Sequence, residues 1–530
     1  MAAASTPLIL GGAPRRTLKA RRVTAVPDHP RPRPDSALTR ALAADLDAAD
    51  FRSDPLRRLW GEEADDALGR GLREPILRAI AGRGDVLSTL GRLWVLGVPQ
   101  PRDDVDRAVP TLGADGLVRL GLAEVQGDGA EEVRPLALIR PQSFVDADGV
   151  GEWWIASDLD EIALGAALPA GHVLGVGGAS RTLAELVIPE PVERALDLGT
   201  GCGIQALLVS RHASRVIATD ISERALAFAE LNAQLNGVHN VEFRAGSLFE
   251  PVSGEAFDLI VSNPPFVITP RASGVPAYEY RDGGMVGDAL VERFLRAAPA
   301  HLAPGGVAQL LGNWEARDGA DGLDRVRSWV RDDLDAWVIQ REELTPLAYA
   351  ELWIRDGGTL PRDAEFGRML TAWLDDFTER GVSAIGFGYI LLRRPVRDGV
   401  PLLRRFETIT QPVSNAGRAL AAGLRAHDVL ASGIPQRLTV APDVTEARHH
   451  LPGSEDPSVI ELRQGGGFAR TVSVDSALAG FVGACDGELT VGQIVGALAE
   501  LLDVPLAALR SDLEPRIRRL VEDGLLIPAP

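Results

Sequence analysis

The spacing of hydrophobic residues changes twice along the chain. From residue 36 to about 140, apolar side chains recur every three or four positions, as in amphipathic helices, and the segment ends in two short alternating runs. From 141 to 395, short apolar runs alternate with helical segments, which is typical of a parallel sheet with helical crossovers. From 402 to 530, short strands precede three helices. The pattern predicts three folded units, with a proline-containing linker at 395–401.

The two outer units share a pattern of helices followed by a short hairpin or a closing strand. In the unit at 36–140 the alternating runs lie near 123–125 and 133–139. In the unit at 402–530 three helices precede a closing apolar run at 524–528. Both patterns predict winged-helix-like α+β modules. Because the module at 36–140 lacks an obviously basic recognition helix, we favour docking or structural support over nucleic-acid binding for it.

Composition excludes several classes of protein. Among 530 residues, 45% are hydrophobic and 24% are charged, as in ordinary soluble globular domains, and no apolar run is long enough to span a membrane. The net charge of −19 argues against a protein that coats nucleic acid by bulk electrostatics. With two cysteines, Cys202 and Cys485, there is no disulfide framework, and we expect a cytoplasmic protein.

Two further segments stand out by composition. Residues 1–35 contain several arginines and prolines and predict a disordered basic arm, with a transit peptide or a nucleic-acid-contacting tail as alternatives. His449 and His450 form the adjacent histidine pair, but they have no spaced partners of metal-binding type. We expect a solvated loop there, and no metal site.

A glycine-rich turn is the centre of the middle unit. The segment RALDLGTGCGIQAL, from Arg194 to Leu207, predicts a buried strand, a turn with Gly199, Gly201 and Gly203 at alternate positions, and a helix. Such a turn admits a ligand where no Cβ stands in the way and offers unpaired N–H groups at the helix start. Its spacing differs from the G-x-G-x-x-G of dinucleotide-binding loops.

A carboxylate follows the next strand. Asp220 ends the run 215–219 and lies 23 positions after Asp197, about where a doubly wound fold presents an acid to ribose hydroxyls. A carboxylate can accept hydrogen bonds from both hydroxyls of a ribose. Ser222 then begins a helix that runs to Leu235.

The fourth strand of the unit, at 257–262, ends in Asn263-Pro264-Pro265-Phe266. The carbonyl groups of Asn263 and Pro264 can each accept one N–H bond from a planar NH2 group, and Phe266 can stack on it. Held in this way, a nitrogen whose lone pair is normally delocalised can point it at an electrophile without a strong general base.

Taken in order, these motifs resemble the class I S-adenosylmethionine (SAM)-dependent methyltransferases, and Asn-Pro-Pro-Phe resembles the catalytic motif of their amino- and amide-directed N-methyltransferases. The Gly283-Gly284 segment and the LAPGG run at 302–306 extend a resemblance to the glutamine N5-methyltransferases of peptide chain release factors, over about 170–315. The resemblance implies a Rossmann-like domain, SAM as cofactor, and a catalytic motif of Asn263, Pro264, Pro265 and Phe266. It also implies a set of cofactor-binding residues: Asp197, Gly199, Thr200, Gly201, Gly203, Asp220, Ile221, Ser247, Leu248 and Asn263.

Ser247 and the segment just before the glycine turn are further candidates to contact the cofactor. Many methyltransferases carry an aspartate where Ser247 stands, to accept from the adenine amino group, and a hydroxyl can still accept there. In related enzymes a loop before the glycine turn covers the cofactor, which makes Gly177, Gly178 and Ser180 candidates for a lid. A plain turn with Ser180 as helix N-cap explains these residues nearly as well.

The sequence therefore predicts a SAM-dependent N-methyltransferase with two winged-helix-like modules. The favoured acceptor is a protein glutamine, in which case the partner is a protein such as a translation factor. A base in ribosomal or transfer RNA (adenine N6 or guanine N2) comes second, and a small metabolite third. A non-catalytic SAM-binding protein that recruits a partner is the competing class, and the oligomeric state stays open.

Overall fold

The computed structural model describes residues 30–127, 131–146, 149–165, 168–272, 275, 281–397 and 399–529. The predicted disordered arm lies almost wholly outside the described residues. None of the described helices is both long and apolar enough to cross a lipid bilayer.

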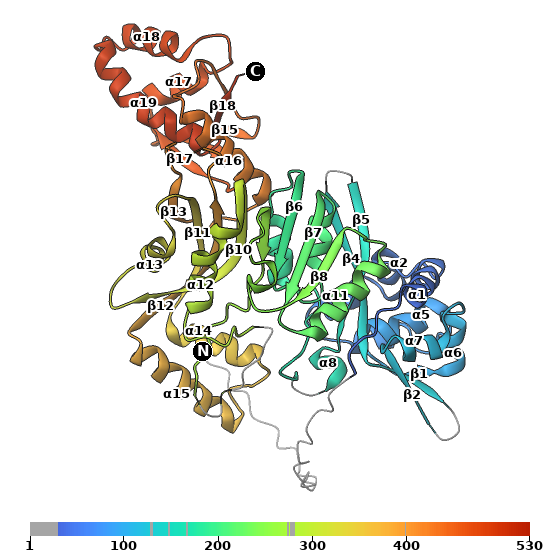
Figure 1. Ribbon diagram of the computed structural model, residues 1–530. Coiled ribbons are helices and arrows are strands. Elements are labelled where there is room, and N and C mark those ends of the chain that lie inside the picture. Colours follow the sequence, from blue (N-terminus) through green and yellow to red (C-terminus); the bar gives the residue numbers. More distant parts are fainter. Residues whose placement is uncertain are drawn as a thin grey trace, which may run out of the picture.

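The middle of the molecule is an eight-stranded sheet with the order β13-β11-β12-β10-β9-β6-β7-β8 (Figure 1). Neighbours from β8 to β10 run parallel, whereas β12 runs antiparallel to both β10 and β11. The predicted parallel sheet is thus confirmed for its central strands. The strands are β6 (Val192–Leu198), β7 (Ala213–Asp220), β8 (Val241–Ala245), β9 (Phe257–Ser262), β10 (Leu302–Arg317), β11 (Asp335–Leu344), β12 (Val382–Arg393) and β13 (Arg404–Thr408).

This strand order fixes where a ligand can bind. From β6 the chain goes outward to β7 and β8, and then returns to place β9 and β10 on the other side of β6. The order reverses between β6 and β9, and in open parallel sheets the carboxyl ends of the strands form a crevice at this point. The glycine turn follows β6 and Asn-Pro-Pro-Phe follows β9, so both motifs lie at the same crevice.

Helices cover both faces of the sheet. One face packs against a hydrophobic cluster with α12 (Ala289–Ala297) and α13 (Gly322–Trp329). The other packs against α9 (Gly178–Leu186), α10 (Ile204–Ser210) and α16 (Ala416–Leu430). Short 3-10 turns, η2 (Glu250–Val252) and η3 (Ala298–His301), connect the layers. The sheet is therefore enclosed, which explains why its central strands are continuous apolar runs.

The N-terminal unit is mostly helical and contains a small sheet of order β1-β3-β2. The sheet interleaves with three helices in the chain order α5-β1-α6-α7-β2-β3. The elements are α1 (Ser36–Ala48), α2 (Ser53–Trp60), α3 (Glu62–Gly69), α4 (Glu74–Ala79), α5 (Val86–Leu90), η1 (Gly91–Val95), β1 (Gln100–Pro101), α6 (Arg102–Ala108), α7 (Gly113–Arg119), β2 (Ala123–Gln126) and β3 (Glu132–Pro135).

A long hairpin joins this unit to the middle one. It consists of β4 (Ala137–Asp146) and β5 (Gly149–Asp158), and is followed by the short α8 (Glu161–Leu164). Asn232 of α11 (Glu223–Leu235) and Asn236, the C-cap of that helix, bond through their side-chain amides to the backbone of Ala156 and Trp154 on β5.

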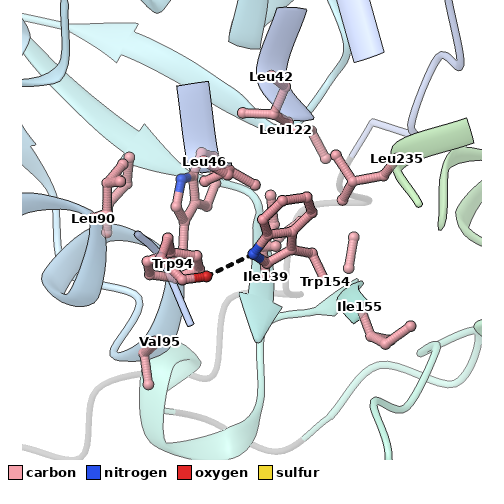
Figure 2. Packing of buried hydrophobic residues seen from close by; sticks show 14 of the residues in the cluster. Leu42, Leu46, Leu90, Trp94, Val95, Leu122, Ile139, Trp154, Ile155 and Leu235 are labelled. Carbon is pink, nitrogen blue, oxygen red and sulfur yellow. Dashed lines mark hydrogen bonds between the residues drawn. The ribbon is translucent and has the colours of Figure 1, made fainter. Parts of the chain in front are cut away.

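One hydrophobic core runs through the N-terminal unit, the hairpin and α11. Figure 2 shows Leu42, Leu122 and Leu235 gathered on one side of this core. The Trp154 indole in it donates to the Phe51 carbonyl at 2.6 Å. We conclude that the N-terminal unit is a fixed part of the molecule.

The central sheet extends beyond the boundary predicted at 395. Strand β13 pairs in parallel with β11, and α16 packs against α9 on the face of the sheet. Arg393 of β12 pairs with Asp428 of α16 at 2.6 Å. Residues 402–430, which the sequence assigned to the C-terminal module, therefore complete the middle unit. An edge strand is short and pairs with residues far away in sequence, so local periodicity does not identify its sheet.

The C-terminal unit begins after α16 and lies on the opposite side of the sheet from the N-terminal unit (Figure 1). Its elements are β14 (Leu438–Val440), β15 (Val444–His450), β16 (Pro457–Gln464), β17 (Thr471–Val474), α17 (Ser476–Gly483), α18 (Val491–Leu501), α19 (Leu506–Glu522) and β18 (Leu526–Pro528). The three helices predicted here are confirmed within a few residues. The solvated loop expected at His449-His450 was wrong, because both residues lie on β15 and pair with β16, although their side chains are exposed.

A helical hairpin is inserted between the antiparallel neighbours β11 and β12. Such strands can be joined by two residues, but here the connection holds α14 (Pro346–Asp356) and α15 (Ala364–Glu379). Both helices form their own hydrophobic cluster with Val267 and Ile268, which follow Asn-Pro-Pro-Phe. The insertion therefore stands beside the crevice.

Candidate active site

A single cavity of about 700 Å³ brings most of the predicted site residues together. Its size is within the range of about 300–1,000 Å³ that is usual for small-molecule sites. Eleven of the predicted residues line it, along with the proposed lid residues Gly177, Gly178 and Ser180. The eleven are Gly199, Thr200, Gly201, Asp220, Ile221, Ser247, Leu248, Asn263, Pro264, Pro265 and Phe266. Asp197 and Gly203 are not among the lining residues.

The glycines of the turn serve two different purposes. Gly199 and Gly201 have φ values of 79° and 55°, and a Cβ on either would meet no atom within 4 Å, so the backbone is open toward the cavity. Gly203 has φ 89°, and a Cβ there would lie 2.9 Å from the Ala229 Cβ of α11. The first two glycines keep the cavity floor clear, and the third lets α10 approach α11.

The N–H groups of the turn are engaged inside the protein. Gly199 and Thr200 donate to the carbonyl of Thr219, both at 2.9 Å, and Gly203 donates to the carbonyl of Thr200 at 2.8 Å. Gly201 donates to Asp220 Oδ2 at 2.9 Å. Three of these four amides thus bond to the end of β7 and one bonds within the turn. The unpaired N–H groups were predicted for the helix start, where Ala206 of α10 already donates to Asp197 Oδ2.

We expect Gly203→Ala to destabilise the fold by about 2–5 kcal/mol, the sum of left-handed backbone strain and overpacking against Ala229. Gly201→Ala is the matched control, because its Cβ meets open space and adds only the backbone strain, about 1–2 kcal/mol. Urea unfolding of both variants measures the difference. Equal destabilisation of the two would contradict the packing role of Gly203.

Asp197 lies beneath the turn. It is 1% exposed, and its Oδ2 accepts from the Thr200 hydroxyl at 2.6 Å and from the Ala206 N–H at 2.9 Å. Burial raises the pKa of this carboxyl from 3.8 to about 7, and the two hydrogen bonds only partly oppose the shift. From this position we infer that Asp197 braces the turn against α10.

The raised pKa of Asp197 predicts a pH dependence of stability. The folded state holds the proton more tightly than the unfolded chain, so this contribution is complete below pH 3.8 and is lost as the pH rises through about 7. Relative to the wild type, Asp197→Asn should gain unfolding free energy from pH 5 to pH 7, by at most about 1.4 kcal/mol per pH unit. Urea unfolding at pH 5, 6, 7 and 8 measures it. Parallel curves for the two proteins would show that Asp197 does not titrate in this window.

Asp220 stands at the carboxyl end of β7, on the wall of the cavity. Its two oxygens accept from the backbone N–H groups of Gly201 and Ser222, at 2.9 and 2.8 Å, which fixes the carboxylate in position. Leu248, which also lines the cavity, has a φ of 48°, unusual for a residue with a branched side chain. Backbone strain of this kind gathers at ligand sites. The Ser222 hydroxyl caps α11 as predicted.

Asn263 follows β9 and lines the same cavity. Its Oδ1 is buried and has no hydrogen-bond partner among the described residues, so this oxygen can accept a hydrogen bond from a ligand. A buried acceptor without a donor costs roughly 1–3 kcal/mol, which a ligand N–H would recover. The Phe266 ring lies 5.5 Å from that of Phe387, centroid to centroid, and is held on the cavity wall.

The inserted helix α14 fixes the chain just after this motif. The Tyr349 hydroxyl is fully buried, accepts from the Ile268 N–H at 3.0 Å, and is bonded to the Asn313 side-chain amide at 2.5 Å. Trp353 and Asp356 of α14 line the cavity, and Asp356 pairs with Arg281 at 3.0 Å. Sequence patterns gave no signal for these residues, because they come from an insertion that has no strand-end motif.

The lid candidates lie at the start of α9. Gly177 is the N-cap and Ser180 is inside the first turn, so Ser180 is not the cap that the alternative interpretation required. Nearby, His172 is 4% exposed on the cavity wall, and burial lowers the pKa of its imidazole. Asp158 of β5 accepts from Arg224 Nε and from the Val173 N–H, both at 2.9 Å. The hairpin thereby anchors the segment before α9.

Parts of the chain match known protein families and individual proteins. Residues 175–318 match the methyltransferase small domain. A second match, over 48–136, is to a domain of unknown function. The release factor glutamine methyltransferase of Xylella fastidiosa (strain Temecula1) is 43% identical over 132 residues, which are 23% of this chain and 47% of that protein. The ribosomal protein uL3 glutamine methyltransferase of Bradyrhizobium diazoefficiens is 40% identical over 128 residues, 22% of this chain and 40% of that protein.

The predicted resemblance to glutamine methyltransferases is confirmed by these matches, and so is the α/β fold with a methyltransferase domain. The chain spans less than half the length of these two relatives. Among solved structures, a ribosomal protein L11 methylase from Lactobacillus delbrueckii subsp. bulgaricus is 18% identical, covering 42% of this chain and 81% of that one, with a TM-score of 0.25. A TM-score of this size adds nothing to the assignment.

Proposed function

We propose that the chain is a SAM-dependent N-methyltransferase that methylates the side-chain amide of a protein glutamine. The observation that carries the proposal is the pairing of two features in one cavity. Asp220 and the open glycine turn form one wall, and Asn263, with an unpartnered buried oxygen, forms another. The cavity thus offers a place for a nucleoside beside a place for an amide nitrogen.

The residues present fit SAM. Asp220 is a fixed acceptor at the end of β7, where ribose hydroxyls can donate to it, and Ser247 and Leu248 line the wall beyond it. Gly199 and Gly201 leave the floor free of side chains. When bound, SAM supplies a methyl group on a positively charged sulfur.

The chain's own residues orient the acceptor. The Asn263 side chain and the Pro264 carbonyl each accept an N–H of the acceptor amide, and Phe266 packs on its plane. The nitrogen lone pair is then turned toward the methyl group. No acid or base of strongly shifted pKa is required, because the proton leaves after the nitrogen has become positively charged.

A protein is favoured as the substrate for three reasons. The relatives reported above are named for glutamine methylation of a release factor and of a ribosomal protein. The net charge of −19 opposes binding to RNA by bulk electrostatics. The inserted α14 contributes Trp353 and Asp356 to the cavity, where Asp356 pairs with Arg281, so a helix absent from the sheet itself can contact a protein substrate there.

We also propose that the outer units are winged-helix-like docking modules. The chain order α5-β1-α6-α7-β2-β3 with the sheet order β1-β3-β2 supports this for the N-terminal unit. In the C-terminal unit, β14 pairs with β18, and its Thr439 also bridges to Asp486. Cys202 and Cys485 are free and buried, as suits an enzyme of the cytoplasm.

The proposal is tested by incubating the purified protein with methyl-labelled SAM and a cell lysate. We expect label in a protein fraction that resists nuclease and is lost on protease digestion. Label that nuclease removes would favour an RNA base as the acceptor. No transfer of label to any macromolecule, with SAM bound, would overturn the proposed substrate class.

A further inference from the structure

Gln205 is a polar side chain of the cavity that was not among the predicted site residues. Gln205 is the second residue of α10, in an otherwise apolar run, and it is 3% exposed. It lines the cavity beside Gly178 and Ser180. Its Nε2 donates to the Ser180 carbonyl at 2.6 Å, whereas its Oε1 is buried and has no partner among the described residues.

This arrangement is unusual for a residue that only fills a core. A buried amide normally satisfies both of its polar ends, because an unpaired acceptor is costly. The bond to Ser180 fixes the side chain, so its oxygen is held in place with no donor of the protein to meet it. Among the described cavity-lining residues, Gln205 and Asn263 are the two with a buried, unpartnered side-chain oxygen.

The two oxygens match two nitrogen groups that the proposed reaction brings together. Asn263 faces the acceptor amide in the proposed function. The methionine end of SAM carries an α-ammonium group, which has three N–H donors and needs acceptors. Four N–H groups of the glycine turn next to Gln205 point inward, to Thr219, Thr200 and Asp220, so these donors are already used.

We propose that Gln205 Oε1 accepts a hydrogen bond from the α-ammonium group of the cofactor. This inference rests on the proposed function and deepens it, because it assigns a residue to the amino-acid end of SAM. A neutral amide suits this task in a cavity that already holds a carboxylate, Asp220, beside the turn. The bond from Gln205 to Ser180 also links the ammonium site to the first turn of α9.

Calorimetric titration tests the assignment with three ligands: S-adenosylhomocysteine, its deaminated analogue, and 5′-methylthioadenosine, which lacks the whole amino-acid end. For Gln205→Met, which keeps the length of the side chain but has no acceptor, we expect S-adenosylhomocysteine to bind about 10- to 100-fold more weakly. Methylthioadenosine should bind within about twofold of its wild-type affinity. In the wild type, loss of the amino group should cost about as much as the substitution does, and in Gln205→Met it should cost little.

Three results would overturn the inference. Unchanged affinity for S-adenosylhomocysteine would show that the ammonium group does not contact Gln205. Equal weakening of all three ligands, in Gln205→Met and in the smaller Gln205→Ala, would show that Gln205 only supports α9. If a variant fails to fold, the wild type alone still tests the inference. Equal wild-type affinity for S-adenosylhomocysteine and for its deaminated analogue would rule out a site for the ammonium group. Failure of the intact protein to bind SAM at all would instead count against the proposed function.

Discussion

Replacing Asn263 by alanine is expected to lower kcat by about 10²- to 10³-fold while SAM affinity stays within about twofold. The magnitude is that of removing one oriented hydrogen-bonding group from a site that works by preorganisation. Asn263 lies at the end of β9, its Oδ1 has no partner among the described residues, and the neighbouring Phe266 is fixed against Phe387. The variant removes the acceptor that orients the amide nitrogen and leaves the walls around Asp220 in place.

The measurement is methyl transfer from labelled SAM to the protein fraction identified with the wild type, with SAM affinity from calorimetry. Thermal unfolding of the variant is the control for folding, and we expect little loss because the side-chain oxygen makes no bond within the protein. A kcat within threefold of the wild type would contradict the proposed role of the Asn-Pro-Pro-Phe motif. A parallel loss of SAM binding would show that Asn263 acts mainly on the cofactor.

Replacing Asp220 by alanine is expected to weaken SAM binding by about 10- to 100-fold, the range for a hydrogen bond to a charged group. Two causes act together. The ribose loses its carboxylate acceptor, and the Gly201 and Ser222 N–H groups lose the oxygens that hold the turn and the start of α11. Titration of SAM and S-adenosylhomocysteine into the wild type and the variant measures the effect.

Asp220→Asn separates the two causes. An asparagine keeps one acceptor oxygen, so it can hold one backbone amide, but it has no negative charge for a ribose diol. We expect an affinity between those of the wild type and the alanine variant, with thermal stability closer to the wild type. If Asp220→Ala binds SAM as tightly as the wild type, the nucleoside lies elsewhere in the cavity.

The sequence predicted the part of the site that depends on local pattern. Four apolar runs, each ending in a chemically distinct group, became β6, β7, β8 and β9, and Asp220 and Asn263 lie where these strands end. The prediction of these two residues succeeded because parallel strands present their carboxyl ends at one edge of the sheet. Residues at the strand ends therefore lie close together, however the rest of the chain folds. The glycine spacing likewise predicted the turn, in which the amides of Gly199, Thr200 and Gly201 bond to the end of β7.

The parts of the fold and the site that the sequence did not predict depend on contacts between residues far apart in sequence. Strand β13 joins the sheet through β11, and a charged cluster with Arg405 and Asp523, 2.5 Å apart, ties the C-terminal unit to it. Nothing local to either residue indicates the other. The helix α14 reaches the site from an insertion between β11 and β12, and nothing local in its sequence indicates that position either. Gln205 could have been noticed, because an amide in an apolar run must find polar partners once it is buried.

The central claim is that this cavity holds SAM and a protein amide together. Tandem mass spectrometry of the macromolecule methylated in lysate tests it most directly, with the Asn263→Ala variant run in parallel. The account predicts a single added methyl group on the side-chain nitrogen of a glutamine, present with the wild type and absent with the variant. A methyl group on a nucleic-acid base, or on a protein atom other than an amide nitrogen, would contradict it.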